Sequence, residues 1–203
     1  MEEKRSSPIV PDQRTGKAID AESSVLMQNE TSAKAFFEIV KNRLQYVNDW
    51  HKLTGDLSAR FQLVNKEGVH VYRRALEGDY LKIDIPGPGN KTGRGYDWVQ
   101  IEAIEDTSFA DVERFGFRVR PAENPQSHRH DIAHFYSHES TSTFIVTRDG
   151  NRITAAISDR NTKPNKDAAF ATDKLRDAVV GAVAAITFSK IQWKGLTDGL
   201  VRM

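Results

Sequence analysis

The sequence predicts an α+β domain: an antiparallel sheet of about six to seven strands, covered on one face by a long C-terminal helix. Two observations carry this prediction. Apolar and polar residues alternate in a series of segments between residues 59 and 158, and one apolar stripe at helical spacing follows from about residue 167. The chain has 203 residues, 38% of them hydrophobic, which suffices for one domain with a sizeable core. We therefore expect a single domain over residues 21–203.

The first 20 residues have the composition of a tail. They mix charges with two prolines and carry few bulky apolar side chains. Such a segment cannot bury enough surface to offset the entropy of ordering it. We expect residues 1–20 to be disordered, and the apolar run SSVLM at residues 23–27 to form the first strand.

A helical segment follows this strand. Thr31 and Ser32 are the candidate caps, and Gly55 is a candidate stop signal. Between them, apolar residues recur at spacings of three and four: Phe36, Phe37, Val40, Leu44 and Val47. This stripe indicates an amphipathic helix with one buried face.

The period then changes to two, which predicts the strands of the sheet. The alternating segments are ARFQLV (59–64), VHVYRR (69–74), DYLKIDIP (79–86), YDWVQIEAIE (96–105), VERFGFRVRP (112–121), STFIVTRD (142–149) and NRITAAIS (151–158). The Asp149–Gly150 pair is a strong hairpin turn between the last two. Because alternation gives one buried and one wet face, we expect an antiparallel sheet that is covered on one side only.

The C-terminal segment supplies the cover. Its apolar stripe runs at alternating steps of four and three through Leu175, Val179, Ala182, Ile186, Ser189, Trp193 and Leu196. The charged residues of the segment mostly fall off this stripe, so we expect one long helix that lies against the sheet.

This order of elements resembles the START-like, or SRPBCC, superfamily with its helix-grip fold. The residues that carry the resemblance are SSVLMQNETSAKAFFEIVKNRLQYVNDWHKLTG (23–55), with its strand, cap, helix and tryptophan, and the terminal helix from about Asp167. The resemblance implies a curved sheet that grips the last helix, with a cavity between them. In relatives this cavity holds lipids, sterols, hormones or polyketides.

For this chain the resemblance implies that a small apolar or amphipathic molecule is bound in the cavity. We expect the ligand-binding residues to be Trp50, Phe61, Ile83, Ile101, Phe117, Phe135, Ala182, Ile186 and Trp193. Neither a cofactor nor a metal is expected, and no catalytic residue is identified. Two alternatives stay open. One is a cyclase or dehydratase type of enzyme, which would need His134, His138 or Glu139 inside the cavity. The other is a protein-interaction module with a filled core, which would use the sheet face or the terminal helix to form a homodimer.

The glycine-rich segment GPGNKTGRG (87–95) looks at first like a phosphate-binding loop. A Walker loop needs glycine directly before Lys91, where this chain has Asn90, and a helix after the loop, where we predict a strand. We therefore interpret the segment as a turn between two strands, with a lid at a cavity mouth as the alternative.

Histidines form a second cluster of potential ligands. His128, His130, His134 and His138 lie close to Asp131 and Glu139. Imidazole and carboxylate are ligands of zinc and iron, but the spacing matches no named signature. If residues 133–139 are a strand, Phe135 takes the core face, and His134 and His138 then face solvent.

Charge and composition exclude several function classes. Lysine and arginine number 29 against 28 acidic residues, so no overall field attracts nucleic acid. The absence of cysteine excludes disulfides and thiolate metal sites. With neither an apolar signal segment at the start nor an uncharged run long enough to span a bilayer, we expect a cytoplasmic protein. Arg114, Arg118 and Arg120 share one face of a strand, which we expect to be solvated; the alternative is that they grip an acidic ligand or partner.

Overall fold

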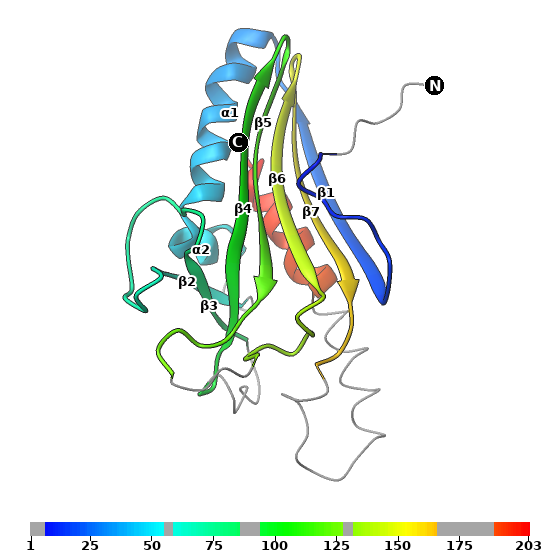
Figure 1. The fold of residues 1–203 in the computed structure, drawn as a ribbon. Coiled ribbons are helices and arrows are strands. Elements are labelled where there is room, and N and C mark those ends of the chain that lie inside the picture. The colour runs from blue at the N-terminus through cyan, green and yellow to red at the C-terminus, as the bar shows by residue number, and fades with distance from the viewer. Residues whose placement is uncertain (1–6, 55–58, 86–93, 128–131, 166–188) are drawn as a thin grey trace.

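The computed structural model describes residues 7–54, 59–85, 94–127, 132–165 and 189–203 (Figure 1). The elements are, in order, β1 (Lys17–Leu26), α1 (Glu30–Gln45), a short 3₁₀ turn (Val47–Asp49), α2 (Trp50–Thr54), β2 (Arg60–Val64), β3 (Tyr80–Asp84), β4 (Asp97–Phe109), β5 (Val112–Pro121), β6 (Thr141–Asp149) and β7 (Arg152–Thr162). A C-terminal helix is described over residues 189–200.

All seven strands form one antiparallel sheet in the order β1-β7-β6-β5-β4-β3-β2. The strands curve, and α1 and the C-terminal helix lie on the same side of them (Figure 1). This architecture confirms the predicted fold class, including the helix after the first strand. None of the described helices combines the length and the apolarity that crossing a bilayer requires.

Alternation along the strands decides which side chains face the helices. Phe115, Phe117 and Val119 of β5 are buried on this inner face, as the sequence predicts. Trp50 of α2 packs against the same face, with ring centroids 5.0 Å from Phe61 and 6.1 Å from Phe117. The aromatic contacts fill the space between α2 and the sheet, so this part of the interior is a solid core.

The sequence prediction of a disordered tail through residue 20 is wrong for residues 7–20. Residues 17–20 are the start of β1, where Ile19 is paired with Asp159 of β7. Residues 7–16 lie along the outer face of the sheet, where Arg118 donates to the Ile9 carbonyl at 2.9 Å and Asn161 Oδ1 accepts from two backbone amides of this segment. The entropy argument failed because these long-range hydrogen bonds are not visible in local composition.

The first helix begins and ends at other residues than predicted. Asn29 is the N-cap and forms a reciprocal capping box with Ser32, so Glu30 already belongs to α1. The helix ends at Gln45, well before Gly55, which lies outside the described residues. The Trp50 indole donates to the Arg43 and Leu44 carbonyls of the last turn, and this side chain therefore helps to terminate the helix.

One predicted strand is absent and one helix is described only in part. Residues 69–74 make a single bridge, from His70 to Val64, and Val69 is 57% exposed. In the C-terminal helix, Trp193 and Leu196 are buried as the stripe predicts. The predicted part of this helix from residue 167 to residue 188 lies outside the described residues.

Candidate functional site

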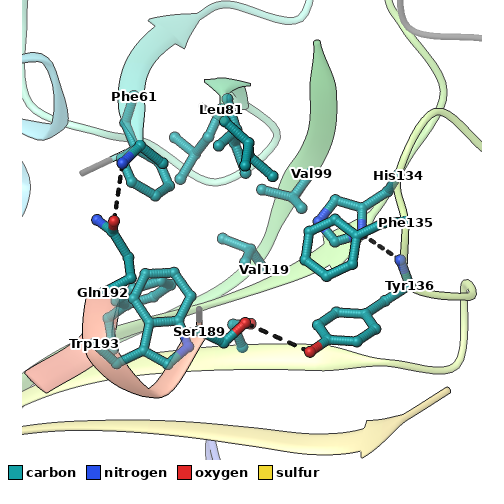
Figure 2. Close-up of a pocket in the computed structure, with 15 residues that line it drawn as sticks. Phe61, Leu81, Val99, Val119, His134, Phe135, Tyr136, Ser189, Gln192 and Trp193 are labelled. Carbon is teal, nitrogen blue, oxygen red and sulfur yellow. Dashed lines mark hydrogen bonds between the residues drawn. The ribbon is translucent and has the colours of Figure 1, made fainter. Parts of the chain in front are cut away.

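A small pocket lies between the sheet and the C-terminal helix (Figure 2). Its volume is about 40 Å³. The wall is made mostly by apolar side chains, with a few polar groups on one side: Ala59, Phe61, Leu81, Ile83, Ile85, Val99, Val119, His134, Phe135, Tyr136, Ser142, Phe144, Ser189, Gln192 and Trp193. We call this the inner pocket.

The structure brings four of the predicted ligand-binding residues together at the inner pocket: Phe61, Ile83, Phe135 and Trp193. Three others, Trp50, Ile101 and Phe117, are buried in the solid part of the core and do not line it. Ala182 and Ile186 lie outside the described residues. An inward position on a strand was therefore not sufficient to place a residue at the pocket, because α2 already covers part of the inner face.

His134 is buried, with 6% of its surface exposed, and lines the inner pocket. The prediction that it faces solvent is wrong. Residues 132–136 form no strand, only isolated bridges at Ile132 and Tyr136, so the assumed alternation fails. The backbone of Phe135 is fixed by Asp97, because the Phe135 amide donates to Asp97 Oδ1 at 3.0 Å. As a result, three consecutive side chains, from His134 to Tyr136, reach the same pocket.

Hydrogen bonding assigns the tautomer of His134. Its Nδ1 accepts from the Tyr136 amide at 2.9 Å, so the ring proton is on Nε2. Burial lowers the pKa of His134, and the nearby charge of Asp97 opposes this only in part. The imidazole is therefore neutral at pH 7 and offers one N–H donor at the wall of an apolar pocket.

Polar contacts join the C-terminal helix to the pocket wall. The hydroxyl groups of Tyr136 and Ser189 are 3.4 Å apart, and Gln192 Oε1 accepts from the Ala59 amide at 2.9 Å (Figure 2). Burial raises the pKa of Tyr136 to about 12, so the phenol stays protonated at neutral pH. The helix thus closes one side of the inner pocket and is held there by specific bonds.

Asp159 of β7 lies behind Trp193 and was not singled out in the sequence. The Trp193 indole donates to its Oδ2 at 2.8 Å, and the residue is fully buried. Burial raises the pKa of Asp159 to about 6. A signal was available: Asp159 continues the inward series Ile153, Ala155, Ile157 of the strand, where a carboxylate is unexpected.

Of the other predicted histidines and carboxylates, His138 and Glu139 are described, and neither lines the inner pocket. Glu139 pairs with Lys163 at 3.2 Å in an exposed position, and His138 lines a different cavity. His128, His130 and Asp131 lie outside the described residues. Within the described ranges, no three His, Asp or Glu side chains are grouped as a metal would require.

The arginines of β5 are half-buried and paired, so the prediction of a solvated row is wrong. Arg118 and Arg120 both bind Glu102, and Arg114 lies 3.5 Å from Glu105. The N-terminal segment covers part of this face, which reduces its contact with water. Of the glycine-rich segment at 87–95, only Arg94 and Gly95 are described, and both have positive φ.

No family model matches this chain, and no curated protein matches it. Solved structures do match. A hypothetical protein from Helicobacter pylori is 13% identical, with a TM-score of 0.48, over 90% of this chain and 87% of that one. Norcoclaurine synthase from Thalictrum flavum, in complex with dopamine and hydroxybenzaldehyde, is 10% identical (85% and 84% covered, TM-score 0.38).

A further match is the ginseng major latex-like protein from Panax ginseng, which is 14% identical with a TM-score of 0.34. The match covers 87% of this chain and 97% of that one. The fold assignment itself rests on the element order and sheet topology of this chain.

Proposed function

We propose that this protein binds a small, partly apolar molecule in the inner pocket. The observation that carries the proposal is the position of His134: a neutral ring whose Nε2–H borders a mostly apolar wall. A pocket of this kind suits a ligand with an apolar body and one hydrogen-bond acceptor. The aromatic rings of Phe61, Phe135 and Trp193 favour a flat or aromatic body.

The inner pocket is too small to admit such a ligand as it stands. A volume of about 40 Å³ holds a few water molecules at most, whereas ligand pockets usually measure hundreds of Å³. Binding therefore requires that a wall side chain moves. Phe135 is the candidate, because it is only partly buried and sits on a segment without regular secondary structure.

The test compares two small aromatic probes, acetophenone and ethylbenzene, of which only the first has a carbonyl acceptor. We expect acetophenone to bind more tightly, with amide shifts in NMR spectra centred on residues 134–136 and 189–193. In a His134→Leu variant the preference disappears while ethylbenzene still binds. Failure of both probes to perturb these amides would contradict the proposal.

An enzyme of the cyclase or dehydratase type is the second candidate, and the burial of His134 in the pocket favours it. With its proton on Nε2, this imidazole would donate to a carbonyl oxygen of the substrate, and so act as an acid or electrophile. The test is to identify molecules that co-purify, by mass spectrometry, and to follow their conversion over time. Conversion by the parent protein that is lost in His134→Gln, with binding retained, would establish chemistry.

A protein-interaction module with a filled core is the remaining reading. It predicts that neither probe binds and that the chain forms a dimer, which light scattering would detect.

A further inference from the structure

A second cavity, larger than the inner pocket, lies on the outer face of the sheet. Its volume is about 390 Å³. We call it the outer cavity; Tyr80, Gln100 and Arg120 form a row across β3, β4 and β5 in its wall, each directly paired with the next. Their chain neighbours Leu81, Val99 and Val119 line the inner pocket. The same three strands therefore separate two cavities on opposite faces of the sheet.

One end of the outer cavity carries a guanidinium in a fixed orientation. Arg120 Nε and Nη2 donate to Glu102 at 2.6 and 3.1 Å, and Nη1 donates to the His138 carbonyl at 2.9 Å. These bonds to described residues use three of the five N–H groups, which leaves two on the terminal nitrogens. Arg118 binds the same carboxylate, so two positive charges face one negative charge at this end.

The ionisation of Glu102 agrees with this excess of positive charge. Burial alone would raise the pKa of Glu102, but the bonds and charges of Arg120 and Arg118 lower it. Glu102 therefore remains a carboxylate that holds Arg120 in place and is not itself available to a ligand.

Hydrogen-bond acceptors line the cavity as well: His138 lies beside Arg120, Gln100 lies in the middle of the row, and Tyr80 lies at its far end. His138 Nδ1 donates to the Pro121 carbonyl at 3.2 Å, which leaves Nε2 as an acceptor. Gln100 Nε2 donates to the Gly78 carbonyl at 3.3 Å, which leaves its side-chain oxygen. The pKa of Tyr80 is raised by burial and then by the charge of Glu123, so the Glu123 carboxylate acts on the Tyr80 hydroxyl.

We propose that the outer cavity is a second binding site, for a small zwitterion whose carboxylate meets Arg120 and whose amino group meets Gln100 and Tyr80. Tyr80 and Arg120 are two strand spacings apart, about 10 Å at the backbone, and both side chains project into the cavity. A molecule with several carbons between its two charges spans this distance better than an α-amino acid does. The planar ring of Tyr80 adds a favourable surface for the ammonium group.

Isothermal titration calorimetry with three matched probes tests the proposal: 5-aminopentanoate, pentanoate and pentylamine. We expect 5-aminopentanoate to bind at least about tenfold more tightly than either probe with a single charge. Arg120→Gln abolishes the advantage over pentylamine, and Glu123→Gln weakens the advantage over pentanoate. Arg114→Gln is the control, since Arg114 is on the same strand and outer face but does not line the cavity.

Two results would overturn the proposal. One is the absence of a binding isotherm for 5-aminopentanoate in the folded parent protein. The other is equal affinity for pentanoate, which would show a simple anion site. If Arg120→Gln fails to fold, Gln100→Met and Tyr80→Phe decide the matter, because they remove acceptors and leave the Arg120–Glu102 pair intact. His134→Leu should leave this affinity unchanged, so the outcome is independent of the inner pocket.

Discussion

Strands β3, β4 and β5 border two cavities that differ in chemistry and in size. The inner pocket is apolar, holds about 40 Å³ and is closed by the C-terminal helix. The outer cavity is polar and holds about 390 Å³, and the Arg120–Glu102 pair forms part of its wall. The alternation of side chains sets the chemistry of each side. The volume is set by what lies above the sheet: a helix packed by aromatic rings on one face, and irregular chain on the other.

The largest expected difference between the inner and outer faces of the sheet is in the stability lost when an aromatic side chain is replaced by alanine. Trp193→Ala should lower the free energy of unfolding by about 3–5 kcal/mol, because it removes a large packed ring and the indole N–H that donates to the buried Asp159 carboxyl. Tyr80→Ala on the outer side should cost about 1 kcal/mol, since its ring is only half-buried. Urea denaturation measures both. Equal losses would mean that the inner pocket is no better packed than the outer cavity.

The second difference is in the pH dependence of two carboxyl groups. The pKa of Asp159 is raised from 3.8 to about 6, so its contribution to stability is complete below pH 4 and is lost as the pH rises to about 6. This loss amounts to about 3 kcal/mol. Glu102 has a lowered pKa, so it contributes stability at neutral pH that is lost as the pH falls through its folded pKa.

Denaturation between pH 3 and pH 7 separates the two groups. Asp159→Asn should remove the loss between pH 4 and pH 6, and Glu102→Gln should reduce the loss in acid. Asp84→Asn is a control at an exposed position of β3. If Asp159→Asn leaves the pH profile between 4 and 6 unchanged, the carboxyl is not buried in solution.

A third prediction concerns free space on the inner face. Ala59→Val should be neutral or stabilise by up to about 1 kcal/mol, because Ala59 borders the inner pocket and the two added carbon atoms can fill it. Ala155→Val should destabilise by about 1–3 kcal/mol, since Ala155 is fully buried in β7 and does not line the pocket. Melting temperatures distinguish these signs. A large loss for Ala59→Val would show that the pocket cannot accept even two more carbon atoms, which argues against ligand binding.

The smallest effects are expected from two hydroxyl groups. Tyr136→Phe should cost about 0.5–1 kcal/mol, because its contact with Ser189 is long and neutral. Tyr80→Phe should change stability by less, since no described residue bonds its hydroxyl directly. Chemical denaturation of both variants checks this order. A reversed order would place the Tyr80 hydroxyl in a structural role and weaken its assignment to a ligand.

The sequence predicted correctly those features that depend on residues close together in the chain. Period-two alternation located β5 at residues 112–121 and the hairpin at Asp149–Gly150 correctly, because strand pairing and turns are properties of neighbouring residues. The cap of α1 was missed by two residues, since Asn29 and Ser32 are both good cap formers and only the backbone geometry decides between them.

The sequence by itself determined the order of most strands and helices and which side chains of β3 and β5 point inward; on β4 the alternation holds as far as Ile101, where a bulge reverses it. Tertiary structure alone decided where space remains and which polar groups border it. His134 points inward because the β-bridges at Ile132 and Tyr136 and the hydrogen bond to Asp97 shape its segment. Asp159 accepts a hydrogen bond from Trp193, which lies on a helix 34 residues further along the chain. Periodicity reports the direction of a side chain relative to its own backbone. Periodicity does not report which distant residues pack against that side chain. The burial of each group, its pKa and the volumes of the two cavities all depend on those distant residues.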